Sequence, residues 1–450
     1  MTKKVSTIIL GAGTAALAAA NRLLDLGISD FLILEKGNNI NKRTCPGVKT
    51  FDCKFCRAGC YTIEGIGGSN ALHGNKICYF PASSEILSNC DENEKQTILN
   101  YLNNYRPYVD NNNLPFTSAY QDSFKFYYSD VLNKNEYKFF INSLTVRLFE
   151  KQLIASNVDI IKIEKRRDGF VLKDEKGQEY FCSNLVMATG RSSYTFLKNI
   201  FDSLQIRYSS LNQDIGIRIE TNKENFNETY YYQVDPKIKF EYESLGLART
   251  FCAHNQGLVV PVQFGNTFFA DGAFSDNFSN HNNIALMVRS NEGLTNFELE
   301  DWCKKMNAYC NNSLVLKKIN LSEKSKTELT NEIFSSIPFF PSEKHKELMR
   351  KLVSNLFDSN QYGILNNTLN FELTIYAPAI DRYWVAPALD RNLQTIGVKN
   401  CYVIGDAIGK SRGILQAMFS GVLWANAFSK TLIKEKPNDK VWSGWLSTSI

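Results

Sequence analysis

Several features that would place the chain in a particular class of protein are missing from its sequence. Beyond residue 35, no apolar stretch approaches the ~20 residues that a membrane-spanning helix needs, so we expect no membrane association. The sequence contains no internal repeat and no low-complexity linker, which argues against solenoid and disordered classes. These absences leave a folded globular protein.

A concentrated region of positive charge is also missing. The net charge is only +5, because 51 Lys and Arg residues face 46 Asp and Glu residues. The pieces Lys317-Lys318 and Lys324-Ser-Lys326 are short, and Glu323 and Glu328 flank the second, which is typical of solvated surface. We therefore expect no nucleic-acid partner.

Length and composition fit two or three soluble domains. A chain of 450 residues can bury large cores, and 44% hydrophobic and 22% charged residues are ordinary values for globular proteins. The 11 cysteines are an odd number and four of them lie between residues 45 and 60, which favours a reducing compartment over a disulfide framework.

The N-terminal segment allows two interpretations. Lys3-Lys4, an apolar run and Ala18-Ala19-Ala20 together resemble a secretory signal with a cleavage site. Cleavage there would destroy the pattern of residues 5–35 described next. The second strand and Glu35 of that pattern nevertheless lie where the complete pattern requires them. We therefore expect the segment to be retained and the protein to be cytoplasmic.

Residues 5–35 carry the most informative pattern. They predict a buried strand at Val5–Leu10, a helix at Ala15–Leu26 and a second apolar strand at Phe31–Leu34. The turn before the helix is Gly11-Ala-Gly-Thr-Ala-Ala16, and Glu35 follows the second strand. Strand, glycine turn, helix, strand and acid in this order predict a site for an adenine dinucleotide.

Each part of this unit has a physical role. Gly11 permits the tight turn, and Gly13 has no Cβ, so a pyrophosphate can approach the backbone. Ala16 lets the helix pack closely on the sheet, and the helix N-terminus offers N–H groups and partial positive charge to phosphates. Glu35 is placed to accept hydrogen bonds from ribose hydroxyls. The candidate cofactor contacts here are Gly11, Gly13, Thr14, Ala15, Ala16, Glu35 and Lys36.

Later segments help to choose the dinucleotide, because NAD and FAD enzymes share the first fingerprint. An apolar strand ends in Ala188-Thr-Gly190-Arg191, and another ends in Gly405-Asp406. Gly413-Ile-Leu-Gln-Ala417 then opens a helix. Together these motifs resemble the glutathione-reductase-like flavoproteins with two dinucleotide-binding domains.

This resemblance implies FAD as the cofactor. It implies that Thr189, Gly190 and Arg191 lie beside the FAD, and that Gly405-Asp406 places a carboxylate on its ribityl or pyrophosphate part. It also implies that Gly413 and Ile414 lie near the isoalloxazine ring.

A second dinucleotide fingerprint is missing. Gly65-Ile-Gly67-Gly68-Ser69 is rich in glycine, but no apolar strand precedes it, so we interpret Gly67, Gly68 and Ser69 as a loop around the FAD phosphates and flavin edge. We therefore expect no dedicated NAD(P)H domain. Electrons would come from the substrate, from NAD(P)H that docks transiently, or from a protein electron donor.

The most unusual motif is a cysteine cluster in which Cys45, Cys53, Cys56 and Cys60 follow the spacing C-x7-C-x2-C-x3-C. Four thiolates this close in sequence could bind zinc or an iron–sulfur cluster. A Cys-x-x-Cys pair could also form a redox disulfide beside a flavin. An accidental cluster in a loop, without any ligand, is the third alternative.

The Cys45-Pro46 pair and the loop position extend the resemblance to a bacterial group of FAD-dependent dehydrogenases with a cysteine-rich loop. In that group a Gly-Gly loop ends in Gly-Lys, whereas this chain has one extra residue, at His73-Gly-Asn-Lys76. Further matches run over most of the chain. They are Ile215–Glu220, Arg249–Ala253 with Gly257, and Asp271–Ser275. The group's substrates are poorly defined, so the resemblance implies fold and cofactor but little mechanism.

The predicted fold class is α/β: a Rossmann-like FAD-binding domain with a parallel sheet, plus a mixed α+β cap domain. The FAD-binding domain would comprise residues 1–92, 125–200 and 371–450, interrupted by a helical excursion at 93–124 and by the cap at 201–370. The adenine would lie over the backbone near Ile160 and Ile161.

Further elements are predicted from periodicity and turn residues. In the FAD-binding domain these are a helix at Ser143–Ala155, a strand at Val158–Ile161, a hairpin of Gly169–Asp174 with Glu179–Phe181, a strand at Asn184–Met187 and a last helix at Leu415–Ser429. Two helical stretches are predicted in the cap, Asn296–Tyr309 and Ser342–Leu356.

Candidate catalytic residues are few. His254 precedes a strand of the cap and could deliver a proton to a substrate. Arg249 and Arg218 could bind a carboxylate or phosphate, although each could equally be a structural ion-pair partner. Tyr383 lies in the segment before Gly405-Asp406, which often reaches the flavin in related enzymes. We name His254, Arg249 and Tyr383 as candidates.

Three functions remain open at this point. The leading hypothesis is a cytoplasmic FAD-dependent oxidoreductase that acts on a small organic substrate under the cap. A flavin-binding redox sensor, or a subunit of a larger complex, is the second. A flavoenzyme that modifies RNA is the third, but it would need the basic tract that this sequence does not have.

Overall fold

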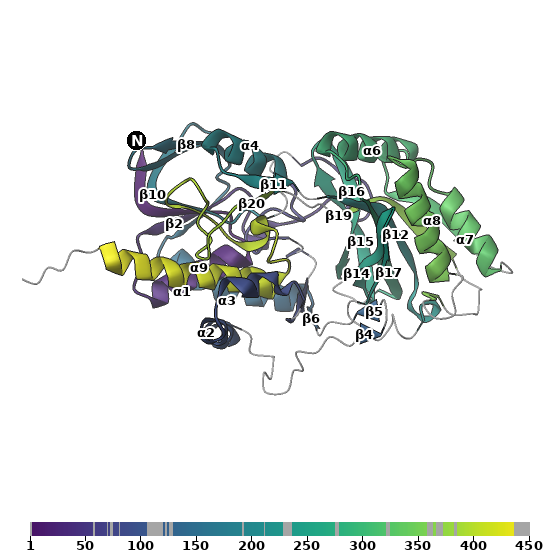
Figure 1. Cartoon of the computed structure of the whole chain (residues 1–450), viewed down its shortest axis with the longest axis horizontal. Helices are drawn as coiled ribbons and strands as arrows, with labels where there is room; N and C mark the ends of the chain where they lie inside the picture. The colour runs from purple at the N-terminus through teal and green to yellow at the C-terminus, as the bar shows by residue number, and fades with distance from the viewer. Residues whose placement is uncertain are drawn as a thin grey trace, which may run out of the picture.

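The structure is a computed structural model of the whole chain. It describes residues 2–56, 59–69, 71–72, 75–80, 82–105, 120–121, 124–125, 129–190, 193–210, 212–227, 236–274, 279–320, 325–357, 363–365, 372–381 and 385–435. The described residues form two regions side by side, each built on its own large sheet (Figure 1).

The first region is built on a seven-stranded sheet in the order β7-β2-β1-β10-β9-β8, with β21 also pairing with β10. Strands β7, β2, β1, β10 and β21 pair in parallel, and β9 and β8 form an antiparallel extension. The strands are β1 (Lys3–Leu10), β2 (Phe31–Glu35), β7 (Ile154–Ser156), β8 (Ile160–Arg166), β9 (Gly169–Asp174), β10 (Glu179–Met187) and β21 (Cys401–Val403).

Helices pack on this sheet because small residues let them approach each other. Helix α1 (Thr14–Asp25) lies against the long C-terminal helix α9 (Ile414–Glu435) (Figure 1). A Cβ on Gly421 of α9 would lie 2.2 Å from the Ala15 carbonyl oxygen, so only glycine allows this contact. The other helices of this region are α2 (Glu92–Asn103), α3 (Lys134–Glu150) and α4 (Tyr194–Leu204).

The second region, the cap, is built on an antiparallel sheet of eight strands in the order β18-β19-β12-β17-β14-β13-β5-β4. Their bounds are β4 (Tyr120–Gln121), β5 (Phe124–Lys125), β12 (Asp214–Asn222), β13 (Lys237–Tyr242), β14 (Gly246–His254), β17 (His281–Ser290), β18 (Val315–Asn320) and β19 (Glu372–Asp381). Two-stranded sheets are formed by β3 (Asn75–Cys78) with β6 (Ser129–Leu132), β11 (Tyr208–Ser210) with β20 (Val385–Pro387), and β15 (Gly257–Phe264) with β16 (Thr267–Phe274).

The cap sheet has one apolar and one polar face along β12. Ile215, Ile217 and Ile219 are buried in the apolar core that helix α8 shares, whereas Arg218 points the other way. Helices α6 (Asn296–Tyr309), α7 (Lys326–Ser335) and α8 (Glu343–Phe357) lie on the outer side of the cap (Figure 1). The polar face of the cap sheet is therefore directed toward the hairpin of β15 and β16 and toward the first region.

The fold class predicted from the sequence is confirmed: a mixed α/β chain with a parallel-containing sheet and a second, antiparallel one. The helix predicted at Ser143–Ala155 was wrong in its bounds, since α3 begins at Lys134. Asn133 and Glu136 form a capping box there, which starts the helix nine residues earlier, and it ends at Glu150 rather than Ala155. The segments Glu179–Phe181 and Asn184–Met187, predicted as separate strands, are the single strand β10.

Other elements differ in extent or were not predicted. Strand β8 begins at Ile160 rather than Val158, and α9 extends past Ser429 to Glu435. Helix α7 was missed, although Ser325 and Glu328 form a capping box that starts it. Strand β19 belongs to the cap sheet although its residues follow the expected cap boundary at 370, because it pairs with β12 and β18.

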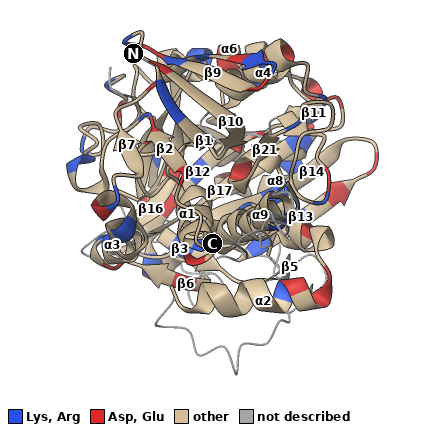
Figure 2. Ribbon diagram, turned by 90° about the vertical axis from the view of Figure 1, so that its left-hand side faces the viewer, with Lys and Arg blue, Asp and Glu red and all other residues tan. Residues whose placement is uncertain are grey.

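Charge is dispersed over the part of the molecule that Figure 2 shows. The ribbon positions of Lys and Arg are interspersed there with those of Asp and Glu among mostly uncharged residues. Among the described residues, no helix combines the length and apolarity needed to cross a membrane.

Candidate cofactor site

Three motifs that are far apart in sequence meet at one edge of the parallel sheet. The last residues of β1, β10 and β21 pair in register, Leu10 with Met187 and Met187 with Val403. Backbone hydrogen bonds continue this register into the turns, from Ala188 N to Leu10 O at 2.8 Å and from Ile404 N to Met187 O at 3.0 Å. The edge where parallel strands end is where α/β sheets bind ligands.

The two glycines of the first turn are required for different reasons. Gly11 has a φ of +95°, and a Cβ there would lie 2.6 Å from the Ala188 carbonyl oxygen, so the fold itself requires glycine. Gly13 has an ordinary φ of −72°, and no atom of the described residues lies within 4 Å of its Cβ position. No contact among the described residues therefore explains why residue 13 is a glycine.

The N-terminus of α1 is open to an anion. Gly13 is its N-cap and provides no side-chain hydrogen bond, and the first turn contains no acidic residue. The first backbone N–H groups of a helix have no partner within the helix and carry partial positive charge. A phosphate placed beside Gly13 would accept from these groups.

Glu35 is buried and ties three segments together. Its Oε2 accepts from the backbone N–H of Ala12 at 2.7 Å, and its Oε1 accepts from Gly37 at 2.8 Å and from Gly65 at 3.0 Å. The sequence predicted Glu35 as a ribose ligand. The structure adds a second role for it, as the anchor that holds the glycine turn to the Gly65–Ser69 loop.

Arg43 holds the other side of that loop. Its buried guanidinium donates to the carbonyl oxygens of Tyr61, Thr62, Ile66 and Gly68, at 2.9, 3.0, 3.1 and 2.8 Å. Burial lowers the pKa of Arg43 to about 10, which still leaves it charged at neutral pH. The guanidinium therefore satisfies carbonyl groups that would otherwise be buried without a partner.

The loop held in this way lies directly on the first turn. The Gly67 N–H donates to the Ala12 carbonyl oxygen at 3.0 Å, and the Tyr137 hydroxyl donates to the Gly67 carbonyl oxygen at 3.0 Å. A Cβ on Gly68 would lie 3.4 Å from the Cα of Gly13. The loop thus lies beside the position expected for the phosphates.

A cavity of about 670 Å³ runs along this edge of the sheet. Ligand sites typically occupy ~300–1,000 Å³, so its size suits a dinucleotide. The predicted cofactor residues that line it are Gly11, Gly13, Glu35, Lys36, Gly68, Ser69, Ile161, Thr189 and Gly190. The segment 158–161 also lines it, where the sequence predicted the adenine.

The other predicted cofactor residues among those described do not line this cavity. They are Thr14, Ala15, Ala16, Gly67, Gly405, Asp406, Gly413 and Ile414. Gly405 packs against α1, since a Cβ there would lie 2.8 Å from the Ala15 Cβ. The Gly405 N–H donates to the Ser420 hydroxyl at 2.8 Å, which fixes the Gly405-Asp406 turn on α9.

Two predicted residues, Arg191 and Tyr383, lie outside the described residues.

Acidic side chains surround one lysine at the end of the cavity nearest β2. Lys36 Nζ lies 3.5 Å from Glu64 Oε1 and 3.7 Å from Asp159 Oδ2, and all three residues line the cavity. Burial opposes the charge on Lys36, but Glu64 and Asp159 outweigh it and raise the pKa of Lys36. Burial raises the pKa of Glu64, and Lys36 partly counteracts this.

The four cysteines of the motif lie in a strap, residues 45–56 and 59–60, that contacts both the first region and the cap. Cys56 and Cys60 line the cavity. Burial raises the pKa of the Cys53 thiol to about 11 and also raises the pKa of Cys56 and Cys60. No group of three His, Cys, Asp or Glu side chains within the described ranges has an arrangement that could hold a metal ion.

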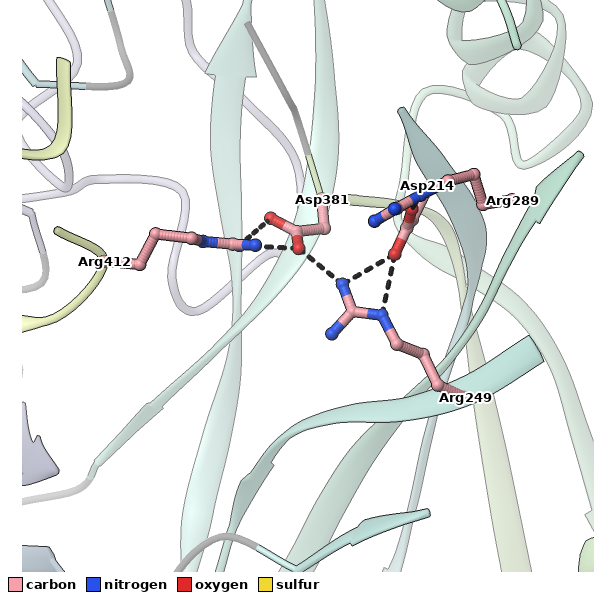
Figure 3. Close-up of polar contacts among 5 residues, drawn as sticks. All are labelled: Asp214, Arg249, Arg289, Asp381 and Arg412. Carbon is pink, nitrogen blue, oxygen red and sulfur yellow. Dashed lines mark hydrogen bonds and ion pairs between the residues drawn. The ribbon is translucent and has the colours of Figure 1, made fainter. Parts of the chain in front are cut away.

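Arg249, one of the candidate catalytic residues, belongs to an ion-pair network between the two regions (Figure 3). Its guanidinium lies 2.6 Å from both Asp214 and Asp381. Arg412, just before Gly413, pairs with both oxygens of Asp381 at 2.6 Å, and Arg289 pairs with Asp214. The network joins cap strands β12, β14, β17 and β19 to the C-terminal segment of the first region.

His254 is also buried in the cap and does not line the cavity. Its Nδ1 lies 2.9 Å from the Cys252 carbonyl oxygen, so Nδ1 is the protonated nitrogen in this contact. Arg218 donates to the same carbonyl at 2.9 Å and to Asn283 Oδ1 at 2.6 Å. A β-bulge at Cys252, with a φ of +49°, turns this carbonyl toward both side chains.

Sequence reasoning missed Arg43 and Glu64 as parts of the site. Each belongs to an irregular segment, where no periodicity predicts which side chain points inward. The only sequence clue was position, because both lie between the second strand and the Gly65–Ser69 loop.

Comparisons with known proteins give a likeness of overall shape only. No protein-family model matches the chain, and no curated protein matches it. Among solved structures, an FAD-containing monooxygenase from Photorhabdus luminescens is 12% identical with a TM-score of 0.40, over 96% of this chain and 90% of that one. A flavoprotein/dehydrogenase from Cytophaga hutchinsonii is 12% identical with a TM-score of 0.39, over 97% and 80%.

A third solved structure is 2,6-dihydroxypyridine-3-hydroxylase from Arthrobacter nicotinovorans. It is 11% identical with a TM-score of 0.41, over 97% of this chain and 85% of that one. At such low identities and scores, the cofactor of this chain has to be inferred from its own residues.

Proposed function

We propose that the protein is an FAD-dependent oxidoreductase that acts on a small organic substrate beneath the cap sheet. The observation that carries the proposal is Gly13. Its backbone angles suit any residue and no part of the chain that the structure describes approaches its Cβ position, so the glycine is best explained by a ligand that touches the backbone there. The turn, the open helix end and the cavity together suit a pyrophosphate.

The choice of FAD over NAD rests on the motifs beyond the first turn. The Ala188–Gly190 turn, the Gly405-Asp406 turn and the Gly65–Ser69 loop surround the same sheet edge as Gly13. The sequence resemblance assigns these motifs to FAD. When bound, FAD supplies hydride or one-electron transfer, and the protein supplies binding, orientation and shielding from water.

The chain's residues divide these tasks. The α1 N-terminus would hold the phosphates, and Glu35 and Arg43 keep the Gly65–Ser69 loop against them. Asp406 is proposed to contact the ribityl or pyrophosphate part. The polar face of the cap sheet, with Arg218 and His254, is proposed to lie toward the substrate and to exclude water.

The electron donor is proposed to be the substrate itself, NAD(P)H that docks transiently, or a protein partner. Binding of zinc or an iron–sulfur cluster by Cys45, Cys53, Cys56 and Cys60 stays a prediction, which metal analysis of the purified protein checks. Whether the reaction is a dehydrogenation or a monooxygenation is a question for product analysis once a substrate is found.

The test is the absorbance spectrum of the purified protein and of two glycine variants. The wild type should carry about one flavin per chain, whereas Gly13→Val should carry none and remain folded. Gly421→Ala is the matched control, because it disturbs the packing of α1 on α9 without lining the cavity. A wild-type protein that neither contains nor binds flavin would refute the proposal.

A further inference from the structure

The backbone hydrogen bonds of Glu35 limit what this residue can offer a ribose. A carboxylate has roughly four acceptor positions, and three of them are occupied by the N–H groups of Ala12, Gly37 and Gly65. One position is left, whereas the ribose of an adenine dinucleotide presents two hydroxyls. A second acceptor is therefore needed at this end of the cavity.

Glu64 is placed to be that acceptor. It lines the same cavity, its side chain is only 18% exposed, and its Oε1 has Lys36 as a partner at the long distance of 3.5 Å. Its Oε2 accepts one backbone hydrogen bond, from Cys60 at 3.1 Å. Acceptor positions on both oxygens remain for a ligand.

The cysteine-rich strap sets the position of this carboxylate. Besides the Cys60 N–H, Gly59 packs against it so closely that a Cβ there would lie 1.8 Å from Glu64 Oε2. Gly59 has a φ of +93° and its N–H donates to the Cys56 carbonyl oxygen at 3.0 Å. Gly59 and Cys60 together therefore form a platform for Glu64.

The charges around this position would disfavour an additional phosphate. Glu35, Glu64 and Asp159 line the cavity together with Lys36, which is the one Lys or Arg among the described lining residues. Behind the wall, the charged Arg43 interacts with Glu35 and Glu64, so three carboxylates are set against two cations, which still leaves an excess of negative charge. Sites that accept a 2′-phosphate instead place an arginine nearby.

We infer that Glu64, held by the strap, accepts a hydroxyl of the adenosine ribose and makes the site select a dinucleotide whose 2′-hydroxyl is unmodified. The inference rests on the proposed function, because it assumes that the cavity takes an adenine dinucleotide. It assigns the strap a role in cofactor recognition that does not depend on metal binding.

The test is calorimetric titration of the flavin-stripped protein with three probes: ADP, 2′,3′-dideoxy-ADP, and ADP carrying a 2′-phosphate. Wild type should bind ADP roughly tenfold or more tightly than the dideoxy probe, because a hydrogen bond to a charged group is lost. It should bind the 2′-phosphorylated probe more weakly than ADP. FAD is titrated in parallel.

Two variants and a control make the result specific. Glu64→Ala should bind ADP more weakly but the dideoxy probe as wild type does, so that the discrimination falls to the part that Glu35 provides. Glu64→Gln keeps the shape and an acceptor for Cys60, and it should reduce the penalty for the 2′-phosphate. Glu343→Ala, whose side chain is 88% exposed on α8, should behave as wild type.

Each outcome decides between the hypotheses. If Glu64→Ala and Glu64→Gln keep the full discrimination between ADP and the dideoxy probe, the inference is overturned, even if FAD binds. An equal loss for both probes would also overturn it, since that indicates a structural role. If ADP discrimination depends on Glu64 but FAD does not bind, the proposed function fails and the role of Glu64 stands.

Discussion

Replacing Gly13 by alanine separates the needs of the fold from the needs of a ligand. The backbone at Gly13 has φ −72° and ψ 175°, and no atom of a residue that the structure describes lies within 4 Å of the added Cβ. A glycine-to-alanine change at such a position stabilises a protein by ~0.4–1 kcal/mol through the unfolded state. The less favourable N-cap preference of alanine offsets part of this, so we expect a net change within about 1 kcal/mol.

The expected effect on the ligand is much larger. The added methyl group would occupy the space through which a phosphate reaches the N–H groups at the start of α1. Loss of one or two charge-assisted hydrogen bonds, each worth ~1.5–3 kcal/mol, corresponds to a weakening of flavin binding by roughly tenfold to ten-thousandfold. Stability without ligand and affinity for the ligand should thus respond very differently.

The assay is thermal unfolding of the flavin-free protein together with fluorescence titration by FAD. Gly13→Ala should unfold within about 3 °C of wild type but bind FAD poorly. Gly421→Ala should instead unfold at a lower temperature and keep its affinity for FAD, because its Cβ would lie 2.2 Å from a carbonyl oxygen and overpacking costs ~1–3 kcal/mol. Wild-type affinity in Gly13→Ala would refute the placement of the phosphates, and a large loss of stability would refute the argument from the empty Cβ position.

Four further predictions follow from other contacts. Arg43→Lys keeps the charge but not the fork that reaches four carbonyl groups, so flavin affinity should fall at least tenfold in titration. A midpoint of unfolding equal to that of wild type would show that the lost hydrogen bonds do not contribute to stability. Asp381→Asn removes the carboxylate that two arginines share and should cost about 3 kcal/mol in urea unfolding; an unchanged midpoint would show that the network contributes nothing. Burial lowers the pKa of His345 from 6.5 to about 4, so the unfolded chain binds the proton first and stability should fall by up to about 3 kcal/mol as the pH drops from 6.5 to 4, a dependence that His345→Gln should remove. Bound FAD should slow maleimide labelling of Cys56 and Cys60, measured by peptide mass spectrometry, whereas equal labelling rates would place the ligand elsewhere.

The sequence predicts the parts of this molecule that depend on regular spacing. The first strand, the Gly11–Gly13 turn and helix α1 follow from a local pattern, since each residue's role depends on neighbours in sequence. Helix α6 was predicted with its observed bounds, and the structure shows a capping box of Thr295 and Glu298 at its start. In these cases the physical cause lies within one segment.

The contacts that complete the site depend on distant segments, which no local pattern encodes. Arg43 is an isolated arginine in sequence, and only the folding of residues 61–68 around its guanidinium gives it a role. Arg249 was a candidate for binding substrate. The structure instead engages it with Asp214 and Asp381, which are 35 and 132 residues away.

The cysteine-rich strap connects recognition of the cofactor with the cap. Its Phe51 carbonyl accepts from the Leu314 N–H at 2.8 Å, and its Phe55 ring lies 6.0 Å from that of Phe268 in the hairpin of β15 and β16. The same strap provides the Cys60 N–H to Glu64 at the cavity. A ligand that orders Glu64 therefore also orders the strap against the cap strands. Dinucleotide binding should then slow hydrogen exchange in β15 and β16, and Glu64→Ala should lose this protection at saturating ligand if the coupling runs through the strap.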